Sequence, residues 1–559
     1  MKRLVFIIVL TININVFAQS DLIWKKPYNE IGTFYSAIQT TDGFIMAGDS
    51  YIRGNYWTGV TSNGSTDAII IKYDNNCNVV WKKHFGGRES EVYNSITAVS
   101  DGFVAAGEAN YRTFGTGDWE GITATGDHNT DRYGIVVKFN NLGNVVWKKH
   151  FGGDVGQDFF NSVTTVSDGI VAAGYATPAS FGTGDWTGIQ GNGFGEAIVV
   201  KYNNNGDIVW KKNFGGVDFD YYESITAVSD GIIAVGRGWE KTFDTGDWSG
   251  ISGKGSADAI IVKYDNDGNV VWKKNFGGGG GDLFSEIMVV SDGVIAVGYS
   301  QSGSFDNGDW AGITGKGNQD AIIVKYNNNG DVIWKKNFGG SYDEEFTSVT
   351  ATSDGIIAAG KGYITDIGTG DWAGFAAKGQ QDAFVVKYDN NGNVVWKKNF
   401  GGNEGDYFFS VTAVSDGIMA AGYSNAGSFG NDDWANVTGK GGYDATIVKY
   451  LIPVISIINL PTTATINVPL TLTGTVAPSE ANQNITWSIV SAGTTGAVLL
   501  NGNELFATAK GTVAVLAIVA NGTALGTDYT QAFYITVSET AVNINEVEVL
   551  PTVISNACV

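Results

Sequence analysis

A repeated motif constrains this chain more than any other feature of its sequence. The motif is Trp-Lys-Lys, and its copies begin at Trp24, Trp81, Trp147, Trp210, Trp272, Trp334 and Trp396. The last four copies are spaced 62 residues apart. A regular period of this length is typical of a repeat protein, in which each unit packs against its neighbours.

Each repeat is expected to form four short β-strands. Residues 321–326 and 332–338 are rich in β-branched and aromatic residues, and the Asn-Asn-Asn-Gly sequence at 327–330 favours a tight hairpin between them. A second strand pair, 287–290 and 294–298, flanks the turn at 291–293. These runs are apolar almost without interruption, which suits sheets packed on both faces. The sequence therefore predicts an all-β protein containing a β-propeller of radially stacked four-stranded blades.

The Ser/Thr-Asp-Gly turns predict the number of blades. Their aspartates are Asp42, Asp101, Asp168, Asp230, Asp292, Asp354 and Asp416, so we expect seven blades. The last repeat ends at Tyr450 without its own Trp-Lys-Lys strand, whereas a spare copy occurs at 21–26. We expect this N-terminal strand to complete the seventh blade, because closure of the ring removes an exposed sheet edge. One lysine of each Trp-Lys-Lys motif is interpreted as pointing outward into solvent, where it protects the outer strand from edge-to-edge pairing.

The chain divides into four segments. Residues 1–18 predict a signal peptide, with Lys2-Arg3 before an apolar stretch and a small-residue cleavage site ending at Ala18. Residues 19–450 form the predicted propeller, and residues 451–538 predict a small β-sandwich with Trp487 in its core. The tail, 539–559, has no assignment. We expect a secreted or cell-surface protein with no transmembrane helix in the mature chain.

Several motifs resemble known families. The repeats contain Phe338-Gly-Gly, the Ser-Asp-Gly turns and the sequences at 295–299 and 320–326. Through these motifs the segment from Asp21 to Tyr450 resembles the bacterial β-propeller repeat family SBBP. The hairpin that ends at Trp272 also resembles the repeat of pyrroloquinoline-quinone enzymes, but no matching pocket residues are found. Motifs at 472–478, 485–488 and 506–512 resemble the bacterial Ig-like domain family, which implies an exported spacer or adhesion module.

The candidate site lies on the end of the propeller that carries the long loops and the crossovers between repeats. Each long loop contains an Asp-Trp pair: Asp118, Asp185, Asp247, Asp309, Asp371 and Asp433, followed by Trp119, Trp186, Trp248, Trp310, Trp372 and Trp434, with Trp57 in the first repeat. In one hypothesis the indoles stack on a ligand while the carboxylates accept hydrogen bonds. In the other, which identical residues in every repeat favour, each loop locks one blade against another.

Positions at which the repeats differ are further candidates for recognition on this end of the propeller. They include Tyr111 with Arg112, Trp239 with residues 240–241, residues 219–222 and residues 343–345. Loops on a rigid scaffold are where recognition residues commonly occur. Drift at unconstrained positions is the alternative explanation.

Charge and motifs narrow the function. A net charge of −22 argues against nucleic-acid binding. The sequence contains no nucleophile elbow, His-Glu metal motif or phosphate loop, so we expect that the protein is not an enzyme and binds no cofactor or metal. The acidic stretches Asp306–Asp309 and Asn431–Asp433 leave calcium binding open. The leading hypothesis is a secreted or cell-surface binding or adhesion scaffold for an extracellular glycan or protein. The alternatives are an exported carbohydrate-active enzyme that uses carboxylates of the same face and a purely structural component. The oligomeric state is not indicated.

Overall fold

The structure of this protein is a computed structural model that describes residues 22–51, 64–124, 126, 130–363, 369–414 and 416–539. The chain forms two compact units, residues 1–451 and 452–559. The predicted signal peptide, Trp57 and the tail from residue 540 onward lie outside the described residues. Among those described, no helix is long and apolar enough to cross a membrane.

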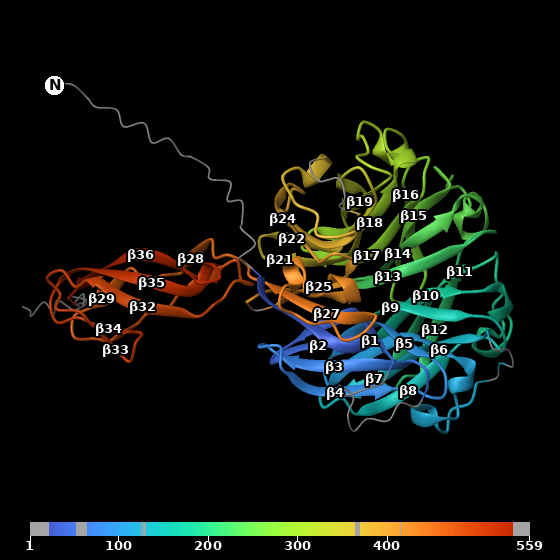
Figure 1. Ribbon diagram of the computed structural model, residues 1–559, viewed down its shortest axis with the longest axis horizontal. Helices are drawn as coiled ribbons and strands as arrows, with labels where there is room; N and C mark the ends of the chain where they lie inside the picture. The colour runs from blue at the N-terminus through green and yellow to red at the C-terminus, as the bar shows by residue number, and fades with distance from the viewer. Residues whose placement is uncertain are drawn as a thin grey trace, which may run out of the picture. The chain divides into compact units, whose positions relative to one another are not determined.

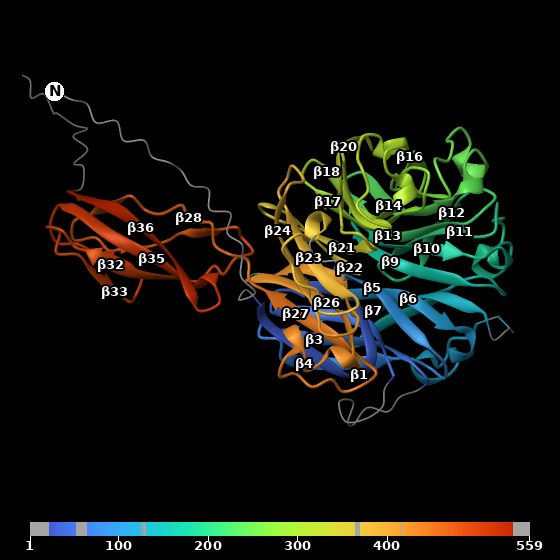
Figure 2. The ribbon, with the colours of Figure 1, turned by 45° about the horizontal axis from the view of Figure 1, so that its top comes forward.

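The first unit consists of antiparallel sheets arranged around an axis, as a β-propeller (Figures 1 and 2). Five sheets have four strands each: β5 (Glu91–Val99), β6 (Gly102–Asn110), β7 (Arg132–Asn140) and β8 (Val145–Phe151); β9 (Asp158–Val166), β10 (Gly169–Ala176), β11 (Glu196–Asn203) and β12 (Ile208–Phe214); β13 (Asp220–Val228), β14 (Gly231–Trp239), β15 (Ala257–Tyr264) and β16 (Val270–Phe276); β17 (Asp282–Val290), β18 (Gly293–Gln301), β19 (Gln319–Tyr326) and β20 (Val332–Phe338); β21 (Glu344–Thr352), β22 (Gly355–Gly362), β23 (Asp382–Tyr388) and β24 (Val394–Phe400).

A seven-stranded sheet joins the two ends of this unit. Its order is β25 (Asp406–Val414), β26 (Gly417–Asn425), β27 (Tyr443–Tyr450), β1 (Leu22–Thr40), β2 (Gly43–Ser50), β3 (Asp67–Asp74) and β4 (Val79–Phe85). The first part of β1 pairs with β27, with Lys25 opposite Val448, and its second part pairs with β2. The prediction that the N-terminal strand completes the last repeat is therefore confirmed.

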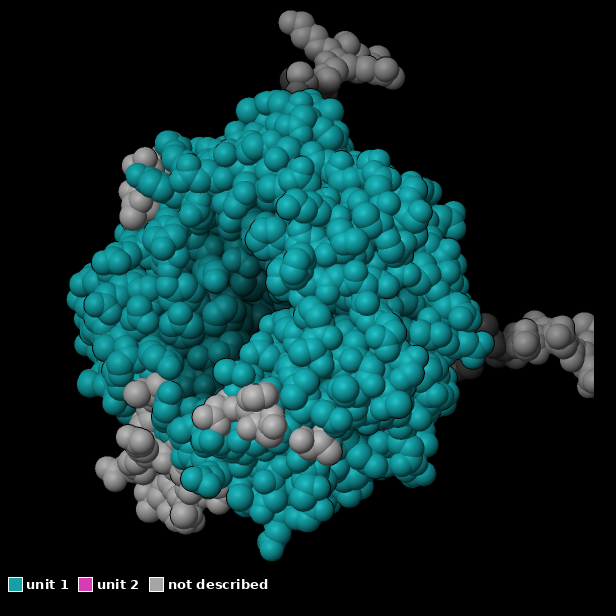
Figure 3. Space-filling model, turned by 90° about the vertical axis from the view of Figure 1, so that its right-hand side faces the viewer, with its two compact units in different colours: residues 1–451 teal, residues 452–559 magenta. Residues whose placement is uncertain are grey.

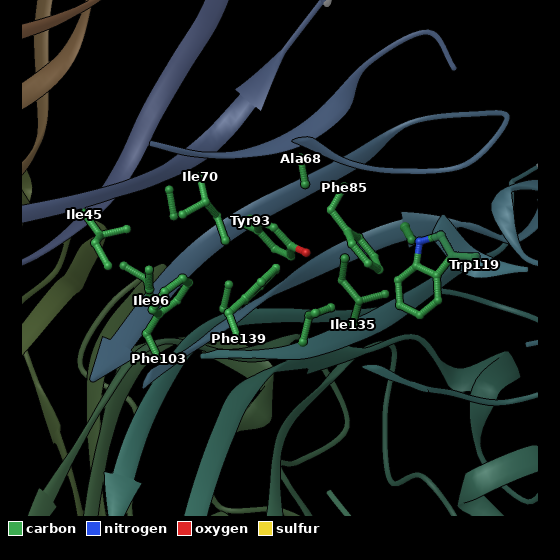
Figure 4. Packing of buried hydrophobic residues seen from close by; sticks show 14 of the residues in the cluster. Ile45, Ala68, Ile70, Phe85, Tyr93, Ile96, Phe103, Trp119, Ile135 and Phe139 are labelled. Atoms are coloured by element: carbon green, nitrogen blue, oxygen red, sulfur yellow. The ribbon is translucent and has the colours of Figure 1, made fainter. Parts of the chain in front are cut away.

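The inner strands close into a ring. Strands β1, β5, β9, β13, β17, β21 and β25 contact one another in this order, and β25 contacts β1. Apolar clusters fill the space between adjacent sheets. In the cluster of Figure 4, Phe85 of β4 meets Trp119, from the loop after β6, edge to face at 5.0 Å between ring centroids. Burial of these aromatic surfaces stabilises the contact between neighbouring sheets.

Short 3-10 helices occupy the long loops between the second and third strands of the repeats. Those that contain the Asp-Trp pairs are η3 (Gly117–Trp119), η5 (Gly184–Trp186), η7 (Gly246–Trp248), η9 (Gly308–Trp310), η10 (Gly370–Trp372) and η12 (Asp432–Trp434). The others are η2 (Tyr111–Thr113), η4 (Pro178–Ser180), η6 (Glu240–Thr242), η8 (Ser302–Ser304) and η11 (Ala426–Ser428). Together with the crossovers they form one face of the first unit, which we call the loop face.

The second unit contains small sheets formed by short strands. They are β28 (Ser456–Ile458), β29 (Thr463–Thr465), β30 (Leu470–Thr471), β31 (Thr475–Ala477), β32 (Ile485–Ser491), β33 (Val498–Leu500), β34 (Glu504–Phe506), β35 (Gly511–Ala524) and β36 (Thr527–Ser538). Val513, Val515 and Ile535 are fully buried in its core. Trp487, the predicted core residue, packs against this core and on Phe533 but is only partly buried, so it borders the fully buried residues.

Candidate functional site

The tryptophans of the Asp-Trp pairs are buried packing residues. Trp119, Trp186, Trp248, Trp310, Trp372 and Trp434 have 0–1% of their surface exposed. Trp248, for example, lies edge to face with Phe214 of the preceding sheet at 4.9 Å, and its indole N–H donates to Asp220 Oδ1 at 2.8 Å. A buried indole has no free face for a ligand. The binding hypothesis is therefore wrong for these six residues, and they pack one sheet against the next.

The aspartates of the same pairs also serve the loops. Asp247 Oδ2 accepts a hydrogen bond from the Gly215 N–H at 3.0 Å, where the crossover leaves the preceding sheet. Asp118, Asp185, Asp309, Asp371 and Asp433 accept the equivalent bonds from Gly86, Gly152, Gly277, Gly339 and Gly401. Asp309 also pairs with Lys254 at 2.6 Å, and Asp433 pairs with Lys378. These contacts assign the carboxylates a structural role that the sequence did not reveal.

A central channel runs between the inner strands, and its cavity volume is about 440 Å³. Figure 3 shows a hollow in the face of the first unit that is turned toward the viewer. Each inner strand contains a β-bulge, and a bulge turns its extra side chain away from the regular pairing. The bulged residues, all of which line the channel, are Tyr35, Asn94, Asn161, Glu223, Ser285, Thr347 and Phe409. They differ between repeats, so the channel wall is not symmetric.

A glycine lies opposite each bulge and explains the close approach of the two strands there. A Cβ atom at Gly236 of β14 would lie only 1.9 Å from the carbonyl oxygen of Tyr221 in β13. Glycine inside a strand commonly marks such a bulge. The repeated Ala-Gly or Val-Gly of the second strand was therefore a signal in the sequence that could have identified the channel-lining residues.

Most polar groups in the channel tie neighbouring sheets together. Ser162 Oγ accepts a hydrogen bond from Ile225 N–H at 3.2 Å, and Ser224 Oγ accepts one from Ile287 N–H at 3.4 Å. In the next sheet Glu286 stands where the others have serine and accepts from Val349 N–H. Repeated hydroxyls of this kind stabilise the ring and do not by themselves indicate a ligand.

Three carboxylates gather on one side of the channel, contributed by consecutive sheets. They belong to Glu223, Glu286 and Glu345. Burial raises the pKa of Glu223 to about 7, with a smaller contribution from the charge of Glu345, and burial raises the pKa of Glu286 to about 7. Glu345 lies 3.7 Å from Lys361 Nζ, but burial dominates and its pKa is also raised. Among the described residues, no group of three or more His, Cys, Asp or Glu side chains could hold a metal ion.

A second cavity, of about 390 Å³, lies on the loop face beside the channel. Its lining residues are Tyr175, Phe219, Asp220, Tyr221, Glu223 and Trp239. Trp239 is 42% exposed and Phe219 is 43% exposed, in contrast to the buried tryptophans of the Asp-Trp pairs. Glu223 lines both cavities, so the loop-face cavity adjoins the channel at this carboxylate. We call it the mouth cavity.

Trp239 and Tyr111, which were predicted to take part in binding because they differ between repeats, lie in different places. Trp239 lines the mouth cavity, whereas Tyr111 is half-buried in another sheet's loop and accepts a hydrogen bond from Arg112 Nε at 3.0 Å. Tyr111 lines neither the channel nor the mouth cavity. Sequence reasoning also identified the variable stretches that contain Phe219, Tyr221 and Glu345, but it missed Glu223 and Glu286.

The chain is distantly similar to several known proteins. No protein-family model matches the chain. A curated relative, the regulatory protein FlaEY of Caulobacter vibrioides, is 24% identical over 184 residues, which cover 31% of this chain and 19% of that protein. The chain thus spans about a fifth of the relative's length. Among solved structures, BamB from Moraxella catarrhalis is 10% identical, with a TM-score of 0.36, and covers 77% of this chain and 99% of its own. The WD40 β-propeller domain of Doa1 is 10% identical, with a TM-score of 0.37, and covers 76% and 96%.

Proposed function

We propose that this protein is an exported scaffold that binds an extracellular ligand through the loop face of a seven-bladed propeller, with an Ig-like sandwich as a second module. The closed order of the inner strands supports the count of seven blades. The four-stranded and three-stranded sheets around one apolar core support the sandwich. The sequence of residues 1–18 supports export to the cell surface or the medium.

The mouth cavity is the observation that carries the binding role. Residues that hold the repeats together recur in each repeat and are buried, whereas Phe219 and Trp239 in the wall of this cavity differ from their counterparts in the other repeats and are exposed. Its volume is within the range of small-ligand sites, and its walls are aromatic with a few polar groups. A rigid ring with a divergent, partly apolar cavity is suited to recognition rather than to packing.

The experiment that tests this proposal has two parts. Cell fractionation and N-terminal sequencing should find the chain outside the cytoplasm and beginning at Gln19. The full mature chain should then bind to an array of glycans or of purified extracellular proteins, and Trp239→Ala should weaken that binding. Retention in the cytoplasm, or silence on both arrays, would contradict the proposal. The sequence predicts no metal but leaves calcium open at Asp306–Asp309 and Asn431–Asp433, and adding a chelator to the same assay tests this alternative.

A carbohydrate-active enzyme is the second candidate, because the channel contains acids suited to proton transfer. Glu223 and Glu286 have pKa values raised by burial to about 7, so each is partly protonated near neutral pH. Glycoside hydrolysis requires one such acid together with a second carboxylate. Release of reducing sugar from oligosaccharides by the wild-type protein, abolished in Glu223→Gln, would establish this candidate. Binding without product would support the scaffold.

A further inference from the structure

Three exposed aromatic side chains come together on the loop face where two sheets meet. They belong to different segments: Phe194 in the loop after β10, Phe219 in the crossover before β13, and Trp239 at the end of β14. Phe194 is 66% exposed and stacks on Phe219 at 6.1 Å between ring centroids. Single exposed aromatic residues are common on proteins, but a contiguous group beside a cavity marks a binding surface. We call these three residues, with Tyr175 and Tyr221 of the mouth cavity, the aromatic groove.

Trp239 is held in place before any ligand arrives. Its backbone N–H donates to the Phe219 carbonyl at 3.0 Å. The guanidinium of Arg237 lies 5.1 Å from the centroid of the Trp239 ring, and Arg237 Nη1 donates to the Tyr299 hydroxyl at 3.1 Å. Cation–π stacking of this kind orients the indole. A preorganised aromatic wall loses little conformational entropy when a ligand binds, so these contacts favour affinity.

Polar groups lie at the inner end of the groove. The Glu223 carboxylate faces both the mouth cavity and the channel, and Asn161 Nδ2 donates to Glu223 Oε2 at 3.3 Å. The hydroxyl groups of Tyr175 and Tyr221 are protonated at neutral pH, and burial raises the pKa of both groups further. The groove thus combines flat apolar walls with acceptors and donors at one end. This combination matches a pyranose ring, which has apolar faces and hydroxyl groups at its edge.

The charge of the surroundings selects among sugars. Glu223, whose carboxylate is ionised above about pH 7, borders the cavity, and the whole chain carries a net charge of −22. A sugar that carries carboxylate or sulfate groups would be repelled. We propose that the aromatic groove binds an uncharged oligosaccharide, with one pyranose ring stacked on Trp239 and its hydroxyls directed toward Glu223. This inference rests on the proposed binding function of the loop face and specifies its ligand.

Titration calorimetry on the full mature chain tests the inference. The probes are uncharged hexasaccharides of glucose and of N-acetylglucosamine, compared with oligogalacturonates as acidic sugars. At least one uncharged probe should bind, and Trp239→Ala and Phe219→Ala should each weaken its binding about 30-fold, as expected for a central aromatic contact. Tyr342→Ala is the matched control, because Tyr342 is 41% exposed in the equivalent crossover of another repeat and lies outside the groove. Circular dichroism confirms that each variant is folded.

The outcomes distinguish this inference from the function on which it rests. No binding of uncharged sugars at millimolar concentration, tighter binding of oligogalacturonates, or an equal loss in Tyr342→Ala would overturn the oligosaccharide assignment. If sugars fail while a purified extracellular protein binds and Trp239→Ala abolishes that binding, the loop face is a recognition site for protein and only the ligand class is wrong. Failure with both kinds of ligand overturns the inference and the proposed function together.

Discussion

Replacement of Trp248 by alanine tests whether the Asp-Trp loops hold the propeller together. The indole is fully buried between Phe214, at 4.9 Å, and Phe243, at 5.1 Å between ring centroids. An aromatic side chain buries roughly 150–250 Å², which at about 25 cal/mol per Å² corresponds to about 4–6 kcal/mol as an upper bound. Truncation of buried aromatic residues typically costs about 3–5 kcal/mol. We therefore expect Trp248→Ala to lower the free energy of unfolding by about 4 kcal/mol.

The lost hydrogen bond to Asp220 should add to this value. The Gly216 N–H, at 3.0 Å, and the Thr242 hydroxyl both donate to Asp220 Oδ2, whereas Trp248 donates to Oδ1, so the substitution removes the partner of a buried acceptor atom, at a cost of about 1–3 kcal/mol. Urea denaturation followed by circular dichroism measures the change. Trp239→Ala is the control, since a half-exposed indole should cost less than about 1 kcal/mol. Equal losses in the two variants, or a loss below about 1 kcal/mol for Trp248→Ala, would refute the packing role.

Three further predictions concern closure, pH and the channel. Deletion of residues 22–26 should lower the midpoint of thermal unfolding measured by calorimetry. The deletion leaves the outer edge of β27 unpaired and removes the hydrogen bond from Lys25 to the Asp433 carbonyl. An unchanged midpoint would contradict closure of the ring by this strand. Burial raises the pKa of Asp220 to about 7 and that of Glu344 to about 8, above the values near 4 in the unfolded chain. The free energy of unfolding should therefore decrease as the pH rises from about 5 to 8, because these buried carboxyl groups lose their protons. Urea midpoints that increase over this range would contradict this assignment. Glu286→Ser should keep an acceptor for the Val349 N–H and remove a buried carboxylate. The free energy of unfolding at pH 8 should therefore be unchanged or rise by about 1 kcal/mol. A loss of more than about 2 kcal/mol would show that the carboxylate itself stabilises the ring.

The repeat period was enough to predict most of the fold. Strands, hairpins and closure follow from apolar runs, from turn residues such as Asn327–Gly330 and from a spare strand at the N-terminus, all of which are local or periodic features. Cys77 illustrates how strongly the turn constrains the backbone: it stands where other repeats have glycine and takes the same left-handed conformation, with φ of 60°. The first lysine of the motif has a role that the sequence did not reveal. The Lys211 ammonium group donates to the Asp185 carbonyl and caps a loop.

The candidate site was predicted only in part, because exposure cannot be read from residue type. Trp239 and Trp248 are both tryptophans on the loop face, yet one is 42% exposed and the other is fully buried. Repetition of Trp248 in every unit was the sign of packing, and the divergence of Trp239 was the sign of recognition. Glu223 was missed because a β-bulge reverses the expected alternation of strand side chains, and the register shift becomes visible only when β13 and β14 are paired.

Sequence alone determined the architecture of this protein, because a period of 62 residues imposes the same strands, turns and apolar faces on each unit, and such faces become buried only when the units stack. Tertiary structure alone decided which of the repeated aromatic and acidic residues remain accessible. Burial depends on what packs against a side chain. Phe214 of the preceding sheet packs on Trp248, whereas Trp239 contacts Arg237 of its own strand and lines an open cavity.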